Sequence, residues 1–259
     1  MKKIFIAVSM LVATMTANAQ EPMTTTTTTT APTGKQYKPV SGDLLAEIGL
    51  FAGAGGITGG VTSLSQSPFN AQTPMLKFRY FLQDQIAVRL GFNYTQNSNT
   101  TKINDPLGTG SVKQMNSVFG LNVGLEKHFT GTGRLSTYAG GDLLFQTVGV
   151  SEKRDNTTNG TTFTNGASST YKGTNAAGTA NGSMGFGVRA VVGADYYFVD
   201  KVYLGAEFGW GFIASKNSKT TSDITPAGGP TVSTTNSSTG GSFNLAPTLT
   251  AGLRLGFRF

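Results

Sequence analysis

Three side chains are the candidates for acid–base or nucleophilic chemistry in this sequence. Glu126 and Asp142 carry carboxylates that could act as an acid and a base, and His128 is the only histidine. General acid–base catalysis needs such groups within hydrogen-bond reach of a bound substrate. The chain has no cysteine, which excludes disulfides, thiol catalysis and cysteine-ligated metals.

The two carboxylates belong to a larger set of charged residues that occupy alternate positions between apolar residues. In a β-strand, alternate side chains point to opposite faces, so these charges should share one face. Charges enclosed in a narrow space must pair to offset the loss of water. The sequence therefore predicts a structural ion-pair network rather than an active site or a conduction path. Its members are Glu47, Lys77, Arg79, Arg89, Glu126, Asp142, Arg189, Asp195, Glu207, Arg254 and Arg258.

Eight segments of the chain show this two-residue alternation. Segment 202–212 is typical, with Leu204, Phe208 and Trp210 in one set and Gly205 and Glu207 in the other. Such a pattern predicts a strand with one apolar face and one face that is small or charged. The predicted strands lie at 44–51, 76–82, 86–94, 119–126, 135–146, 186–196, 202–212 and 249–259.

The connections between these segments alternate between short and long. Short turns are expected near 83–85, 130–133 and 199–200, and long Gly-, Thr-, Ser- and Asn-rich loops at 55–72, 96–114, 149–182 and 215–242. An even-stranded antiparallel meander with this asymmetry is typical of outer-membrane proteins. We therefore predict an all-β fold, an eight-stranded antiparallel up-and-down transmembrane β-barrel. A soluble β-sandwich would place the charges outside, and the glycines between them suit a crowded barrel interior better.

The N-terminal residues predict export. Lys2 and Lys3 precede an apolar run, and Ala17-Asn18-Ala19 supplies small residues before a cleavage site after Ala19. An N-terminal membrane anchor is the alternative, but the run is shorter than the ~20 residues needed to span a bilayer. We assign residues 1–19 to a signal peptide, 20–42 to a Thr/Pro-rich flexible linker and 43–259 to the barrel.

Composition excludes several other classes of protein. Charged residues make up 13% of the chain, glycine occurs 35 times, and no helical period of apolar residues is sustained. The net charge of +7 falls to +5 when Lys2 and Lys3 leave with the signal peptide. A basic balance can indicate nucleic-acid binding, but the basic residues are scattered and the chain is exported, so we expect no nucleic-acid partner.

Residues 43–259 resemble the family of small outer-membrane β-barrels that includes the membrane domain of OmpA, OmpX and OmpW. The C-terminal stretch is similar to the signal that the barrel-assembly machinery reads, at Thr250, Gly252, Leu255, Phe257 and Phe259. The resemblance implies a Gram-negative outer-membrane location, with extracellular loops and both termini in the periplasm. It implies membrane lipids and the assembly machinery as partners. Separately, we predict no cofactor or metal.

Three functions remain open at this point. The first is a structural or surface-interaction barrel whose lumen is plugged by ion pairs, and the second is a narrow passive porin-like channel for small solutes. The third, an outer-membrane enzyme, would need a histidine near the outer rim, whereas strand parity places His128 at the short-turn end. The loops contain few aromatic residues, so the sequence does not identify a surface partner.

Overall fold

The computed structural model describes residues 37–50, 76–237, 241–244 and 250–259, all within one unit of the chain, Gln36–Phe259. No helix in these residues is long and apolar enough to span a membrane. The predicted signal peptide, the linker as far as residue 36 and the predicted loop at 55–72 lie outside the described residues. The strands are β1 (Leu44–Leu50), β2 (Leu76–Gln83), β3 (Ile86–Asp105), β4 (Gly108–Phe129), β5 (Leu135–Asp155), β6 (Ser168–Lys172), β7 (Ser183–Val199), β8 (Val202–Asn217), β9 (Thr220–Thr225), β10 (Val232–Asn236), β11 (Gly241–Asn244) and β12 (Thr250–Arg258).

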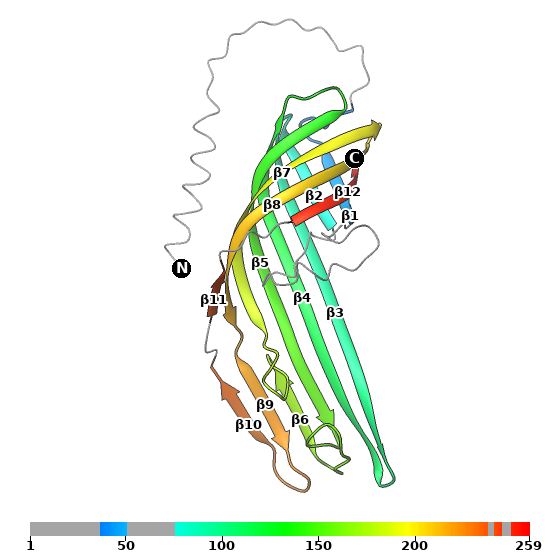
Figure 1. Cartoon of the computed structure of the whole chain (residues 1–259), viewed down its shortest axis with the longest axis vertical. Helices are drawn as coiled ribbons and strands as arrows, with labels where there is room; N and C mark the ends of the chain where they lie inside the picture. Colours follow the sequence, from blue (N-terminus) through cyan, green and yellow to red (C-terminus); the bar gives the residue numbers. More distant parts are fainter. Residues whose placement is uncertain (1–36, 51–75, 238–240, 245–249) are drawn as a thin grey trace, which may run out of the picture. The chain divides into compact units, whose positions relative to one another are not determined.

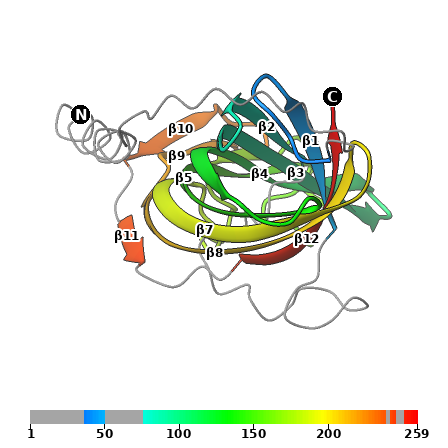
Figure 2. The same ribbon diagram turned by 90° about the horizontal axis from the view of Figure 1, so that it is seen from above.

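Eight strands form a closed ring of antiparallel pairs in the order β1, β2, β3, β4, β5, β7, β8 and β12 (Figure 2). The ring closes where β12 returns to β1, with Leu45 opposite Arg258 and Ile48 opposite Leu255. Closure leaves no unpaired edge where the eight strands meet. The predicted all-β antiparallel architecture is confirmed, and the eight predicted strand segments correspond to the eight ring strands, apart from residues 51 and 249, which lie outside the described residues.

The short turns lie where the sequence predicts them. Asp84 and Gln85 join β2 to β3, residues 130–134 join β4 to β5, and Asp200 and Lys201 join β7 to β8. Lys201 has a φ of 70°, which allows the tight reversal. Phe259 donates its backbone N–H to the carbonyl of Leu44 at 2.8 Å, so the start of β1 and the end of β12 meet at this same end.

The prediction of long loops at 96–114, 149–182 and 215–242 is wrong in large part. β3 and β4 run through the first of these segments and are joined only by Pro106 and Leu107, and β5 continues to Asp155. β6, β9 and β10 lie in the other two and extend the sheet beyond the ring in the order β5, β6, β9, β10 (Figure 1). We call this outer part of β3, β4 and β5, with β6, β9 and β10, the extension.

The extension has a small core on the face that continues the inside of the ring. Ile103, Val112, Val150 and Ala167 are buried there. Residues 156–167 are ordered by hydrogen bonds, because the Asn159 side-chain oxygen accepts the N–H groups of residues 161 and 162 at 2.9 Å each. The outward-projecting connections are therefore built from strands and hydrogen-bonded turns.

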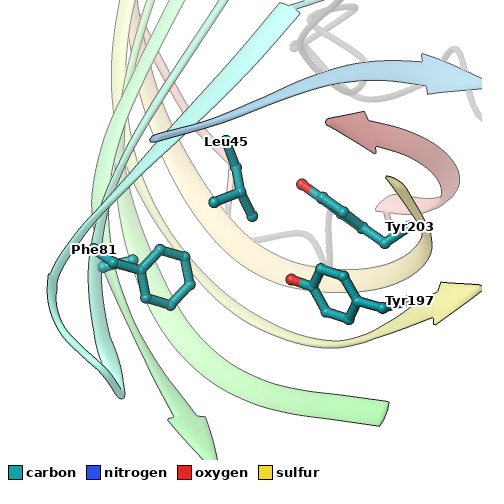
Figure 3. Packing of buried hydrophobic residues seen from close by; sticks show 5 residues of the cluster. Leu45, Phe81, Tyr197 and Tyr203 are labelled. Atoms are coloured by element: carbon teal, nitrogen blue, oxygen red, sulfur yellow. The ribbon is translucent and has the colours of Figure 1, made fainter. Parts of the chain in front are cut away.

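A second cluster fills the ring at the short-turn end. Leu45, Phe81, Ala87, Tyr197 and Tyr203 are fully buried and pack together (Figure 3). Their rings and methyl groups close the interior of the ring beside the short turns.

Residues 37–43, most of which we assigned to the linker, contact this end of the ring. Tyr37 packs against the apolar cluster, and the Arg134 guanidinium lies 4.4 Å from the centre of its ring. The Ser41 amide donates to the Asp84 carboxylate at 2.9 Å. The segment just before β1 is thus part of the folded structure.

Candidate functional site

Ten of the eleven predicted charges are buried inside the ring, and every ring strand contributes at least one. Strand alternation explains the placement, because the apolar residues beside these charges point to the outer face, as along β8. None of the ten is more than 8% exposed. The five acids are Glu47, Glu126, Asp142, Asp195 and Glu207, and the five bases are Lys77, Arg79, Arg89, Arg189 and Arg254.

Two acids each bind three bases in the middle of this group. Glu207 contacts Lys77 and Arg89 at 2.9 Å and Arg254 at 3.1 Å. Glu47 contacts Arg254 at 2.9 Å and Lys77 at 3.3 Å, and it also pairs with Arg79. These contacts link β1, β2, β3, β8 and β12 across the inside of the ring.

Glu126 and Asp142 extend the network to β4, β5 and β7. Glu126 binds Arg79 at 2.9 Å and Arg89 at 3.0 Å. Asp142 binds Arg89 at 2.8 Å and Arg189 at 2.5 Å. With both carboxylates held by arginines, neither is available to take a proton from a substrate.

Asp195 completes the acid set, binding Arg79 at 2.7 Å and Arg254 at 3.1 Å. The ten residues therefore form one connected network with equal numbers of cations and anions. Such neutrality is what burial requires, since an unpaired charge in a dry interior costs several kcal/mol.

Two tyrosines join this network, and sequence reasoning missed both. Tyr138 donates to Glu207 at 2.8 Å and accepts from Arg254. Tyr203 donates to Glu47 at 2.7 Å and accepts from Arg79 at 2.8 Å. Tyr203 lies in the same alternating set as Glu207, so strand parity predicts its inward position, but the predicted network contained only charged residues.

Glycines on neighbouring strands make room for these rings. A Cβ atom on Gly256 would overlap the ring of Tyr203, and one on Gly193 would overlap the ring of Tyr138. Gly205 leaves space for the side chains of Asp195 and Arg254 in the same way. At these three positions, the large side chains of neighbouring strands fill the space that a side chain on the glycine would occupy.

His128 connects the network to Ser136. Its Nε2 lies 3.0 Å from Glu126 and its Nδ1 lies 2.8 Å from the Ser136 hydroxyl. The imidazole also stacks near Phe81 and Tyr138, with ring centres 4.9 and 5.2 Å away. A serine, a histidine and an acid can form a nucleophilic triad, but all three are buried here and Glu126 is held by two arginines. The trio therefore serves as a structural link.

Arg258, the eleventh predicted charge, lies apart from the network at the short-turn end. It contacts Asp200 at 3.2 Å and Asp43 at 3.6 Å, and it donates to the Lys38 carbonyl at 2.6 Å. In the described residues, no group of three or more His, Asp or Glu side chains could hold a metal ion.

The outer face of the ring is apolar and exposed. We call this set of side chains the apolar belt. Phe208 and Trp210 on β8 are 45% and 51% exposed, and their sequence neighbours Glu207 and Gly211 face the inside of the ring, as strand alternation requires. The belt comprises Leu44, Ile48, Tyr80, Leu82, Leu90, Tyr94, Val123, Phe129, Leu143, Phe186, Val192, Tyr196, Phe198, Leu204, Phe208, Trp210, Phe212, Leu253 and Phe257.

The five residues predicted to form the assembly signal lie on or just after β12. Thr250 and Gly252 pair with Gly209 and Glu207 of β8. Leu255 is half-buried, whereas Phe257 and Phe259 are exposed.

Comparisons with known proteins add a family to this geometry. The model of the Putative OmpA-OmpF-like porin family matches residues 63–259. No curated protein matches the chain significantly. Among solved structures, a major outer membrane protein from Thermus thermophilus is similar at 16% identity, over 84% of this chain and 98% of that chain. The TM-score of that match is 0.34, too low to establish a shared fold.

Proposed function

Because this chain belongs to the OmpA-OmpF-like porin family, we propose that it is an integral outer-membrane protein whose ring spans the bilayer as an eight-stranded up-and-down β-barrel. The observation that carries the proposal is the distribution of side chains. Ten charges are buried inside while Leu204, Phe208 and Trp210 are exposed outside. Water would favour the opposite distribution, whereas lipid favours this one.

The height of the apolar belt supports a membrane location. On β8 the outward-facing apolar residues run from Val202 to Phe212, and on β4 they run from Phe129 to Phe119, interrupted by exposed Lys127 near the short-turn end. At about 2.4 Å of height per residue in a tilted strand, each run spans roughly 25 Å, which matches the apolar band of outer-membrane barrels. Exposed Tyr94 and Trp210 lie toward one rim and Tyr80 and Tyr196 toward the other, as interfacial aromatics do.

Within this barrel the lumen is closed by the ion-pair network and the protein has a structural or surface-interaction role. Contacts among the ten charges cross the interior from every strand, and the apolar cluster at Tyr197 and Tyr203 fills the short-turn end below them. An eight-stranded barrel is just wide enough to hold its own side chains. The extension stands on the extracellular side, and the short turns face the periplasm.

One observation favours the alternative, a narrow passive channel. Gln146 is 3% exposed, yet neither its side-chain oxygen nor its nitrogen has a hydrogen-bond partner. Its cross-strand neighbours are Gly120 and Gly185, which offer no side chain to pair with it. A buried amide of this kind is usually satisfied by water, and water at this level would begin a polar path.

Planar-bilayer recording of the refolded protein separates the two functions. We expect no steady conductance from the unaltered protein or from a Lys153→Gln/Asp155→Asn control, which neutralises an exposed pair. A reproducible, solute-selective conductance that rises when Lys77→Met and Glu207→Gln remove an interior pair would contradict the plugged lumen and favour the channel.

Two further parts of the proposal concern export and assembly. The Ala17-Asn18-Ala19 site directs cleavage after Ala19, so the mature protein should begin at Gln20. Leu255, Phe257 and Phe259 are on the lipid-facing side at the end of β12 and form the segment read by the barrel-assembly machinery. Support comes from the position of β12, which closes the ring between β8 and β1.

A further inference from the structure

Three lysines gather on the outward face of the extension, the face that continues the apolar belt. Lys102 on β3, Lys113 on β4 and Lys153 on β5 are all exposed, and strand parity places them on the same side as Tyr94. We call them the outer lysine patch. Two acids lie on the same face: Asp155 pairs with Lys153 at 3.1 Å, and Asp223 on β9 lies in the same register row as Lys153, beyond Thr170. The patch therefore keeps a net positive charge.

Two lysines of the patch face each other across neighbouring strands, which destabilises the sheet when no ligand is bound. Lys113 lies directly opposite Lys153 in the β4–β5 register, with Thr100 and Thr170 as the next neighbours on either side. Like charges facing each other across strands destabilise a sheet. An anion bound between the two ammonium groups would remove that repulsion.

The height of the patch above the belt restricts the anion. Lys113 is six residues beyond Phe119 on β4, and Lys102 is eight residues beyond Tyr94 on β3. At about 2.4 Å per residue these separations are roughly 14 and 19 Å. Ordinary phospholipid headgroups reach only about 5–8 Å beyond the hydrocarbon. A lipid phosphate at this height must be carried on a larger headgroup.

Most outward side chains between the belt and the patch are uncharged and polar, and Met115 on β4, opposite Ser98, is apolar. β3 presents Gln96, Ser98 and Thr100 in this interval, all of them exposed. Hydroxyl and amide groups are hydrogen-bonding partners for sugar hydroxyls. From the membrane outward, the same strands therefore present apolar, hydroxyl-rich and cationic zones in turn.

We propose that the outer lysine patch binds phosphate groups on the sugar headgroup of a glycolipid in the surrounding leaflet. The acyl chains of this lipid contact the belt, its sugars face Gln96, Ser98 and Thr100, and a phosphate lies between Lys113 and Lys153. The proposal rests on the membrane location argued above.

The experiment uses the full protein, refolded into phosphatidylcholine vesicles that contain a minor fraction of rough lipopolysaccharide, whose core sugars are phosphorylated. Since the chain has no cysteine, a Thr100→Cys variant carries one donor dye beside the patch. Energy transfer to labelled lipopolysaccharide, relative to transfer to labelled phosphatidylcholine, gives the enrichment of the glycolipid near the patch.

A cation near a membrane surface contributes about 1 kcal/mol, or about fivefold in binding. We expect at least fivefold enrichment, and its loss in Lys113→Gln/Lys153→Gln. A Lys201→Gln/Lys219→Gln control, which removes the same charge elsewhere, should keep it. Dephosphorylated lipopolysaccharide should show no enrichment.

Equal enrichment of the dephosphorylated lipid, or an unchanged Lys113→Gln/Lys153→Gln variant, would overturn the proposal. Because free phosphate competes for the same lysines, the enrichment should fall when inorganic phosphate is added and should persist in chloride of equal ionic strength. Absence of transfer even to labelled phosphatidylcholine would instead contradict the membrane location itself.

Discussion

Glu126 is the residue at which the burial of charge has the clearest energetic consequence. It accepts from Arg79 and Arg89 and contacts His128, with its carboxylate out of reach of water. Glu126→Ala would leave two buried guanidinium groups short of an anion. We expect the free energy of unfolding to fall by about 3–5 kcal/mol, the range for a broken buried pair. Urea unfolding of the refolded protein in vesicles measures the change.

The matched control is Asp155→Ala, which breaks the exposed pair with Lys153. Those side chains are 46% and 58% exposed, and exposed pairs contribute about 0.2–1 kcal/mol. Equal effects of the two substitutions would show that water reaches Glu126 in the folded state.

A second prediction concerns pH and Glu152, which lies on β5 in the extension. Burial raises the pKa of its carboxyl group, but hydrogen bonds from Arg154, Gln114 and the Ala176 amide outweigh burial and hold the pKa below its ordinary value of 4.5. A depressed carboxyl pKa stabilises the folded form above the unfolded pKa, and that stability is lost as the pH falls through the folded pKa.

We therefore expect residues 156–182 to become more susceptible to pepsin as the pH falls below about 4.5. Glu152→Gln should be equally susceptible on both sides of that pH, because it cannot ionise. If the variant keeps the full pH dependence of the natural protein, another acid such as Asp105 or Asp155 is responsible.

The inward position of some interior residues can be predicted from the sequence, and that of others cannot. Alternation alone placed Glu207 and Arg254 on one face, because each lies between apolar neighbours. The same alternation includes Tyr203, but an aromatic ring fits either face of a barrel strand. Its inward position is determined by the space at Gly256 on the adjacent strand, and that neighbour relation exists only once β12 pairs with β8.

At the scale of the element, β8 offers a test of the apolar belt. Phe208 lies in the belt and is 45% exposed, while Ile224 on β9 in the extension is 44% exposed. Phe208→Arg should cost about 2–4 kcal/mol in vesicles if the position faces the middle of the bilayer. Ile224→Arg should change the unfolding free energy little, since exposed substitutions in water usually have effects within about 0.5 kcal/mol. Similar costs at both positions would contradict a lipid-facing belt.

β12 is the element on which we expect assembly to depend. Deleting Gly256–Phe259 removes the pairs that hold its end to β1 and β8, and with them the exposed Phe257. We expect the truncated protein to be degraded or retained in the periplasm, as cell fractionation would show. Deleting much of the threonine tract at 24–30 should leave the outer-membrane fraction unchanged. Normal insertion of the C-terminal deletion would argue that the assembly signal lies elsewhere.

The extension shows where sequence reasoning loses information. Residues 96–104 of β3 have no two-residue alternation of apolar side chains, because hardly any of their neighbours are apolar. A strand that buries neither face has no alternating hydrophobic pattern in its sequence, so its register cannot be predicted from that pattern. The β-branched threonines at 100 and 101, and the Asp-Pro-Leu-Gly turn at 105–108, were the available signals for a continued hairpin.

At the scale of the whole ring, the ring closes and the ion-pair network forms in the same step. Glu47 and Arg254 are 207 residues apart in sequence, and their contact requires β1 to have met β12. The network therefore forms only when the first and last strands of the ring are in register. This dependence explains why the interior can hold ten charges, since each gains its partners at the same step that removes it from water.

The attachment of residues 37–43 has a mechanical consequence. Ser41 is bonded to the β2–β3 turn through Asp84, Tyr37 is held by Arg134 at the start of β5, and the Lys38 carbonyl is held by Arg258 at the end of β12. Tension applied to the chain at residue 37 would act on these bonds before it reaches β1. A pull from the N-terminal side must rupture them before it can peel β1 from its neighbours one pair at a time.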